Sequence, residues 1–207
     1  MKLIEYLNNI VPFLNQPSYQ QKVDKLYNNI NVDEESLKEF KKLSEDFVTQ
    51  LHNVHLTLGL ISELKELYET AENTINKNTD PTDVLDEAGD VLWYAGQLCI
   101  INNLQFKAYP EDPVNDMFEC TLNLSDIIKK NFAYDKDLNM DQVEKYMQVV
   151  VHDVEKLLKP FNYTLEEAFE YNVKKLSLRF KDNNGVFSQE LAANKDANQE
   201  KEQLTNN

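Results

Sequence analysis

Two short segments of the chain each place two carboxylates one helical turn apart: Glu63-Leu-Lys-Glu66 and Glu87-Ala-Gly-Asp90. Residues three apart share one face of an α-helix. If the two helices pack antiparallel through the turn-rich stretch 76–81, the four acids converge. Clustered carboxylates repel one another unless a cation lies between them, and oxygen ligands favour a hard metal such as Mg²⁺, with Mn²⁺ as the alternative. The spacing therefore predicts a metal site formed by Glu63, Glu66, Glu87 and Asp90.

Both pairs of acids border runs of apolar residues. These are Leu60, Ile61, Leu64 and Leu67 around the first pair, and Ala88, Val91, Leu92, Trp93 and Tyr94 around the second. A carboxylate beside an apolar seam carries a desolvation cost that a bound cation offsets. The alternative is a solvated helix face, because such spacings are common in a chain with 36 Asp and Glu residues.

A basic stripe follows later in the sequence. Asn172, Lys175 and Arg179 recur at intervals of three and four, so an amide, an ammonium and a guanidinium share one helix face. Lys and Arg side chains in this arrangement suit a polyphosphate group. A solvated basic face near a helix C-terminus is the alternative, since the helix dipole favours cations there.

The composition indicates a helical protein. The 207 residues include only four Gly and six Pro, and the net charge of −15, with a sequence pI of about 4.6, argues against a general nucleic-acid-binding surface. No run is long and apolar enough to span a bilayer, and the first residues lack the apolar core of a signal peptide, so we expect a cytoplasmic protein. Cys99 and Cys120 form no recognisable motif, and we expect two buried, reduced thiols.

Helix boundaries follow from Pro, Gly and capping residues. Asp80 precedes Pro81 in the arrangement that favours a helix start, and Thr164 with Glu167 forms a capping box. The expected helices cover residues 33–76, 81–103, 114–131, 140–159 and 164–181, preceded by short helices around Pro12 and Pro17 and followed by one short helix after Ser188.

Three runs carry a family resemblance: 51–67 with the first acidic pair, Glu87-Ala-Gly-Asp-Val-Leu-Trp-Tyr94, and Asn172-Val-Lys-Lys-Leu-Ser-Leu-Arg-Phe180. Together they resemble the MazG-like all-alpha nucleoside triphosphate pyrophosphohydrolases, and phage-encoded members most of all. The run 187–196 is similar to the end of such proteins, with Lys195 where Arg is usual. The resemblance covers roughly residues 48–104 and 160–196.

The resemblance implies an all-α helical bundle and a Mg²⁺-dependent hydrolysis of a nucleoside triphosphate to the monophosphate and pyrophosphate. The resemblance implies metal ligands, phosphate contacts and a polar contact in the nucleotide pocket: Glu63, Glu66, Glu87 and Asp90 for the metal, Lys175 and Arg179 for phosphate, and Asn172 for the nucleotide. A carboxylate that is not fully occupied as a ligand can orient the attacking water, and we choose Glu66 for this role. His55 and Trp93 are further candidates for substrate contacts. Their alternatives are a structural histidine and a core aromatic residue.

Residues 104–159 depart from the family pattern, in which the basic helix follows the second acidic helix almost directly. The segment is either an inserted helical hairpin or a degenerate second repeat, since a shift of 63 positions sets Asp90 over Asp153. We therefore expect an N-terminal helical extension at 1–47, the pyrophosphohydrolase domain at 48–187 and a polar tail at 188–207. We also expect a homo-oligomer, with a dimer favoured.

Other functions remain open at this point. A pyrimidine-specific dUTPase or dCTPase of the all-alpha type would use the same residues, and an alarmone substrate is not excluded. A non-catalytic helical protein whose acidic face binds a partner is the competitor from a different class. Nucleotide turnover that depends on Mg²⁺ would distinguish an enzyme from such a protein.

Overall fold

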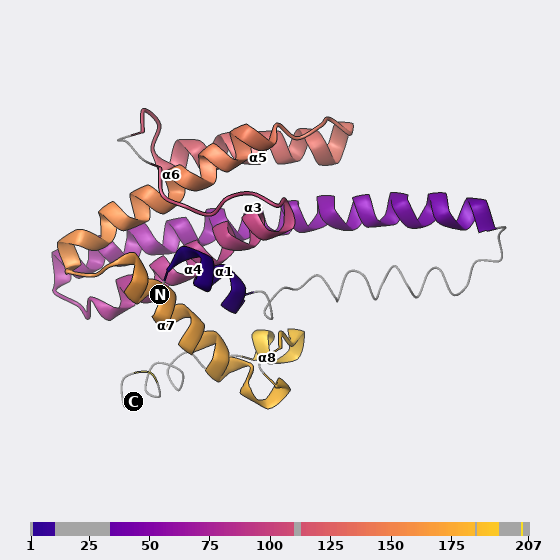
Figure 1. Cartoon of the computed structure of the whole chain (residues 1–207). Coiled ribbons are helices and arrows are strands. Elements are labelled where there is room, and N and C mark those ends of the chain that lie inside the picture. Colours follow the sequence, from indigo (N-terminus) through magenta and orange to yellow (C-terminus); the bar gives the residue numbers. More distant parts are fainter. Residues whose placement is uncertain (1, 11–33, 110–112, 185, 195–203, 205–207) are drawn as a thin grey trace.

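The computed structural model describes residues 2–10, 34–109, 113–184, 186–194 and 204. Within these residues every regular element is a helix, which confirms the all-α prediction (Figure 1). The short helices expected around Pro12 and Pro17 lie outside the described residues. None of the described helices combines the length and the apolar character needed to cross a membrane.

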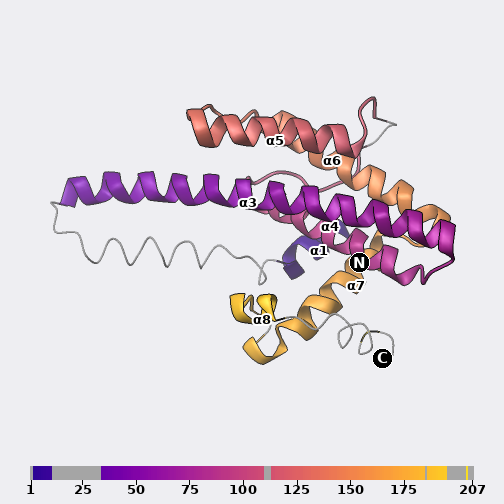
Figure 2. The ribbon, with the colours of Figure 1, turned by 180° about the vertical axis from the view of Figure 1, so that it is seen from behind.

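Helices α3 (Glu34–Lys77) and α4 (Thr82–Ile101) form the hairpin that carries both acidic pairs. Asn78 ends α3 in the left-handed conformation, with φ 54°. The Asp80 carboxylate accepts a hydrogen bond from the Thr82 backbone N–H at 2.9 Å, so Asp80 stabilises the start of α4 as expected, although the regular helix begins at Thr82 rather than Pro81. The amino-terminal end of α3 projects past the other helices (Figures 1 and 2).

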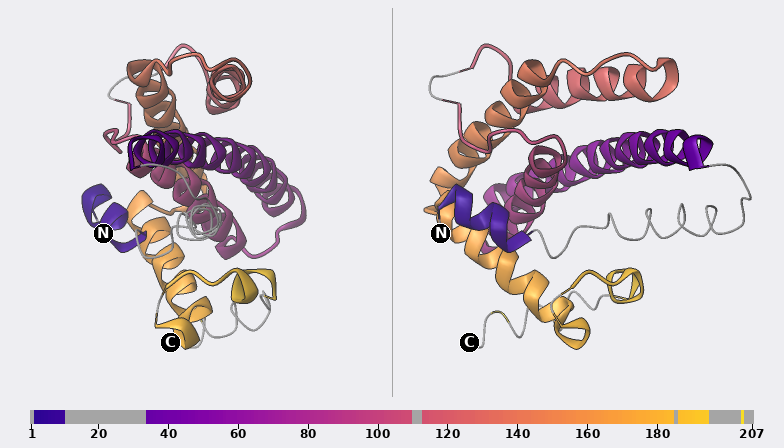
Figure 3. Two further views of the ribbon diagram at one scale, coloured as in Figure 1. Left: turned by 90° about the vertical axis from the view of Figure 1, so that its right-hand side faces the viewer. Right: turned by 45° about the vertical axis from the view of Figure 1, so that its right-hand side comes forward.

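A second hairpin, formed by α5 (Met117–Tyr134) and α6 (Met140–Leu158), packs on one side of the first. Helix α5 contacts α3, and α6 contacts α4, which completes a four-helix arrangement within one chain (Figure 3). The α5 helix begins three residues later than expected because Asp116 is its cap: the carboxylate accepts from Glu119 N at 2.9 Å. This packing is compatible with both origins of the segment, insertion and duplication.

The remaining helices lie on the opposite side of the α3–α4 hairpin (Figures 1 and 3). Helix α7 (Leu165–Arg179) begins at the predicted capping box of Thr164 and Glu167 and packs on α4, and α1 (Leu3–Ile10) packs on both. Two 3-10 turns flank α7: η2 (Lys159–Phe161) before it and η3 (Lys181–Asn183) after it. The short helix α8 (Gln189–Ala193) follows, as the sequence predicts. Helix α4 is therefore covered by α6 on one side and by α1 and α7 on the other.

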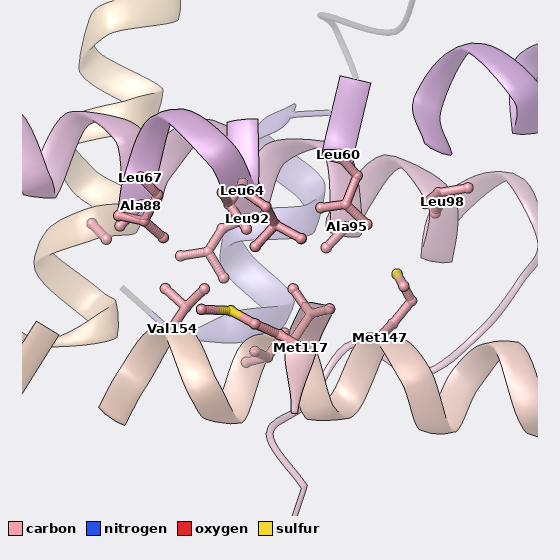
Figure 4. Packing of buried hydrophobic residues seen from close by; sticks show 14 of the residues in the cluster. Leu60, Leu64, Leu67, Ala88, Leu92, Ala95, Leu98, Met117, Met147 and Val154 are labelled. Carbon is pink, nitrogen blue, oxygen red and sulfur yellow. The ribbon is translucent and has the colours of Figure 1, made fainter. Parts of the chain in front are cut away.

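The core surrounds α4 and takes side chains from α1, α3, α5, α6 and α7, and Figure 4 shows part of it. Leu60, Leu64 and Leu67 on α3 recur at helical spacing and are fully buried, so the apolar run beside the first acidic pair faces the core. Burying each such side chain contributes about 1.5–3 kcal/mol. Cys99 and Cys120 are free and buried, as expected, and burial raises the pKa of the Cys120 thiol to about 11.

Candidate metal centre and pocket

Three of the four predicted acids converge between α3 and α4. One carboxylate oxygen from each of Glu63, Glu66 and Glu87 lies within 4.8 Å of the others. Glu63 and Glu87 are half-buried, and Glu66 is exposed. The antiparallel hairpin brings them together, because the first pair lies near the end of α3 and the second near the start of α4 (Figure 1).

The donor set fits a small divalent cation. Oxygens bound to an octahedral Mg²⁺ at about 2.1 Å lie about 3.0 Å apart when adjacent and about 4.2 Å apart when opposite, so three oxygens within 4.8 Å of one another could close on one cation by side-chain rotation. All three donors are carboxylate oxygens, which is the chemistry that Mg²⁺ and Mn²⁺ prefer. The site therefore fits the predicted metal by ligand type and by spacing.

Clustering also perturbs the acid–base behaviour of the site. Burial raises the pKa of the Glu87 carboxyl to about 7, and the nearby carboxylates of Asp90, Asp86 and Glu66 add to the effect. Without a cation, the Glu87 carboxyl is therefore only partly ionised near neutral pH. Repulsion of this kind is the cost that a bound cation would remove.

Asp90 is arranged differently from the other three acids. Its Oδ1 accepts hydrogen bonds from Lys175 Nζ at 2.7 Å and from Asn172 Nδ2 at 3.0 Å, both on α7. The other carboxylate oxygen, Oδ2, accepts neither of them. The structure thus ties one oxygen of Asp90 to the basic stripe instead of grouping it with Glu63, Glu66 and Glu87.

Lys175 is enclosed rather than solvent-facing. Only 3% of the residue is exposed, and its ammonium pairs with both Asp86 and Asp90. Burial alone would lower the pKa of Lys175, but the two carboxylates hold it above its usual value, so the ammonium stays charged. In this arrangement Lys175 joins α7 to α4, and it is not among the residues that line the pocket with Arg179.

Asn172 is also buried, with none of its surface exposed. Its Oδ1 accepts a hydrogen bond from the Tyr6 hydroxyl at 3.0 Å, and its amide group donates to Asp90. Gly89 lets α7 approach this closely, because a Cβ at that position would lie 2.9 Å from Asn172 Cβ. Asn172 is therefore a link between three helices.

A pocket of about 190 Å³ opens beside the acids. Two of its lining residues are the acids Glu63 and Asp90, and a third is Arg179, the single arginine of the sequence. The others are Trp93, Tyr94, Leu176, Phe180, Phe187 and Ala192. The pocket therefore combines carboxylates, a guanidinium and aromatic rings at one place, and it draws residues from α3, α4, α7 and the carboxyl-terminal segment.

The two aromatic residues after the second acidic pair form part of this wall. Trp93 and Tyr94 pack edge to face, with ring centroids 4.7 Å apart. The Trp93 indole N–H is buried and has no hydrogen-bond partner among the described residues. Tyr94 fits against Gly59, where a Cβ would approach its ring to 2.1 Å, and burial raises the pKa of its hydroxyl to about 12.

His55 lies outside the pocket lining. It is half-buried on α3, its ring centroid is 6.3 Å from that of Tyr94, and burial lowers its pKa. The structure therefore places it beside Tyr94. A direct substrate contact by His55 has no support in this arrangement, and it remains a prediction.

A larger pocket, of about 560 Å³, lies beside α5 and α6. Its only charged lining residues among those described are Asp141 and Lys145. No cluster of acids borders it, so its chemistry does not match the residues that the sequence singles out.

Sequence reasoning missed three contributors to the site. Tyr6 lies in a segment without family resemblance, and Asp86 is outside the three-residue spacing. Phe180 was noted only as part of a similar run. For Asp86 the sequence offers only its place beside Glu87 on the same helix, and its pairing with the buried Lys175 is visible only in the structure. Lys195, at the end of the similar tail, lies outside the described residues.

Comparison of the chain with protein-family models, with curated proteins and with solved structures finds no match.

Proposed function

We propose that this protein is a divalent-metal-dependent nucleoside triphosphate pyrophosphohydrolase that releases a nucleoside monophosphate and pyrophosphate. The observation that carries the proposal is the convergence of Glu63, Glu66 and Glu87 within 4.8 Å, next to a pocket that Arg179 also lines. Carboxylates that could hold a cation and a guanidinium that could grip phosphate are the two complementary parts that a bound triphosphate requires.

The acidic residues would supply the metal site. Glu63, Glu66 and Glu87 would hold Mg²⁺ or Mn²⁺, with Asp90 Oδ2 as a further oxygen. When bound, the cation would offset the negative charge that develops on the phosphate oxygens. Glu66 is the exposed member of the group and has direct access to solvent, which suits the proposed role of orienting the attacking water.

The remaining steps concern the substrate. The water oxygen would attack the α-phosphorus, the bond from that phosphorus to the α–β bridging oxygen would break, and the water proton would pass to a carboxylate. Arg179 would hold phosphate oxygens through two parallel hydrogen bonds. Lys175, which is buried and pairs with Asp86 and Asp90, could add a contact through its third N–H.

The pocket supports recognition of one part of a nucleotide. Its volume of about 190 Å³ is below the roughly 300–1,000 Å³ of pockets that enclose a drug-sized ligand, so it would take a base or a sugar. Trp93 and Tyr94 offer ring faces and edges for stacking, and the Trp93 N–H, which has no partner in the part of the chain that the structure describes, could donate to a base.

A nucleotide panel tests the proposal. Purified protein would be incubated with ribo- and deoxyribonucleoside triphosphates and an alarmone, with Mg²⁺, Mn²⁺ or a chelator, and the products separated as pyrophosphate or phosphate. We expect metal-dependent pyrophosphate release that Glu63→Gln abolishes. Glu72→Gln, which changes an exposed acid on the same helix, is the matched control and should retain activity. Turnover of one pyrimidine nucleotide alone would identify the specialised alternative, and no turnover of any nucleotide would contradict the proposal.

A further inference from the structure

The side chain of Tyr6 connects helix α1 to the candidate site. The residue is fully buried, and its ring stacks on Phe169 of α7 with centroids 4.4 Å apart. Phe106 flanks it at 6.1 Å. Because both neighbours hold the ring, the position of the hydroxyl is determined by packing.

The hydrogen bonds around this hydroxyl have only one consistent direction. An ionised carboxylate can only accept, so Asn172 must turn its NH₂ group toward Asp90 and its carbonyl oxygen toward Tyr6. The Tyr6 hydroxyl must therefore donate, to Asn172 Oδ1 at 3.0 Å, with the Gly89 carbonyl oxygen as a longer second acceptor at 3.5 Å. Burial, with the charge of Asp90, raises its pKa well above the usual value, so the proton is retained.

This series of hydrogen bonds ends at Asp90, the fourth predicted acid, which lies outside the cluster of Glu63, Glu66 and Glu87. Asp90 Oδ1 accepts from Asn172 at 3.0 Å and from Lys175 at 2.7 Å, and Asp90 also lines the pocket with Glu63. Two donors on Oδ1 hold the carboxylate plane and leave Oδ2 outside this network. A carboxylate that is held in this way needs little reordering to act as a ligand.

We propose that Tyr6 is a positioning residue for the metal site: its hydroxyl orients the Asn172 amide, which in turn holds Asp90 for binding a divalent cation. The proposal rests on the proposed function. It assigns a role in the site to the N-terminal extension, which has no counterpart in the runs that carry the family resemblance. Losing the hydroxyl would allow the amide to rotate and present its oxygen to the carboxylate.

Tyr6→Phe isolates the effect, since it keeps the stacked ring and removes only the hydroxyl. The first measurement is Mn²⁺ affinity of the full chain, from the electron paramagnetic resonance signal of free Mn²⁺. Loss of a group that orients a ligand typically costs about 10- to 100-fold in metal affinity, and we expect at least about 10-fold here. Tyr163→Phe is the matched control, because its hydroxyl contacts Thr82 near the start of α4 at 3.5 Å without touching Asp90, and its affinity should equal that of the wild type.

A second measurement follows the intermediate residue. In ¹⁵N spectra of asparagine-labelled, metal-free protein, the side-chain amide hydrogens of Asn172 should exchange slowly with solvent. Tyr6→Phe should shift the signal of this amide and accelerate its hydrogen exchange. In an Asn172→Ala background, Tyr6→Phe should not weaken Mn²⁺ binding further, because its route to Asp90 is already broken.

The outcomes separate the two proposals. Unchanged Mn²⁺ affinity, or an unchanged Asn172 amide signal, in folded Tyr6→Phe protein would overturn the role of Tyr6 while leaving the metal site intact. Wild-type protein that binds no Mn²⁺ would overturn the proposed metal site, and with it any role of Tyr6 in metal binding. Equal losses in Tyr6→Phe and Tyr163→Phe would assign the effect to general loosening of the helices.

Discussion

Glu87→Gln should stabilise the metal-free protein, and the gain should depend on pH. Glu87 is half-buried among other acids, and its pKa is raised from 4.5 to about 7. Between these values the folded chain holds a proton at this site that the unfolded chain has lost. The free energy of unfolding of the wild type therefore falls as the pH rises through this window. Glutamine has no charge to lose, so the variant escapes this decrease.

The size of the gain follows from the two pKa values. The difference between 4.5 and about 7 corresponds to an upper limit of about 3.4 kcal/mol, at about 1.36 kcal/mol for each pKa unit. Glu87 is only half-buried, so solvent screens part of the repulsion. We expect Glu87→Gln to be about 1–2 kcal/mol more stable at pH 8 and equal in stability to the wild type near pH 4.5.

Urea denaturation in a chelating buffer, repeated at intervals from pH 4.5 to 8, measures this difference. The difference between the two proteins is the quantity of interest, because the other acids titrate in both. Glu72→Gln serves as the control and should differ from the wild type by less than about 0.5 kcal/mol at every pH. Adding Mg²⁺ should stabilise the wild type more than Glu87→Gln, since the variant lacks one ligand.

Parallel curves for Glu87→Gln and the wild type would refute the reasoning. They would show that Glu87 is ionised at no cost, as an isolated acid on a solvated helix face would be. A variant that is less stable at pH 8 would also contradict it.

Four further outcomes are expected. Lys175→Met should lower the free energy of unfolding by about 3–5 kcal/mol, because its two carboxylate partners would lose a buried counter-charge; a neutral result in urea denaturation would contradict the ion-pair network. Gly59→Ala should displace the Tyr94 ring, lower the free energy of unfolding by about 1–3 kcal/mol and weaken nucleotide binding in calorimetry. Unchanged nucleotide affinity would show that the ring does not contact the nucleotide. Arg179→Ala should raise the Michaelis constant for a triphosphate while Mn²⁺ affinity stays constant, and wild-type kinetics would contradict a phosphate contact by this residue. A homodimer, which the exposed apolar side chains of α3 favour, would double the mass in light scattering, and a strict monomer would contradict it.

The sequence by itself was sufficient to predict the described helices and the clustering of three of the four acids. Helix boundaries depend on local signals, and those signals placed α3, α4, α6 and α7 within a few residues of their observed bounds. Two pairs of acids on either side of one turn must meet if the helices are antiparallel, so the grouping of Glu63, Glu66 and Glu87 could be predicted.

Only the tertiary structure decided which partner each charged side chain takes. Asp90 has the same spacing from Glu87 as Glu66 has from Glu63, but packing of α7 on α4 buries Lys175, and a buried ammonium must be paired. The carboxylates nearest to it, on Asp86 and Asp90, fill that need. A spacing rule describes one helix at a time, whereas charge compensation depends on which helices meet, so the sequence could not distinguish Asp90 from the other acids.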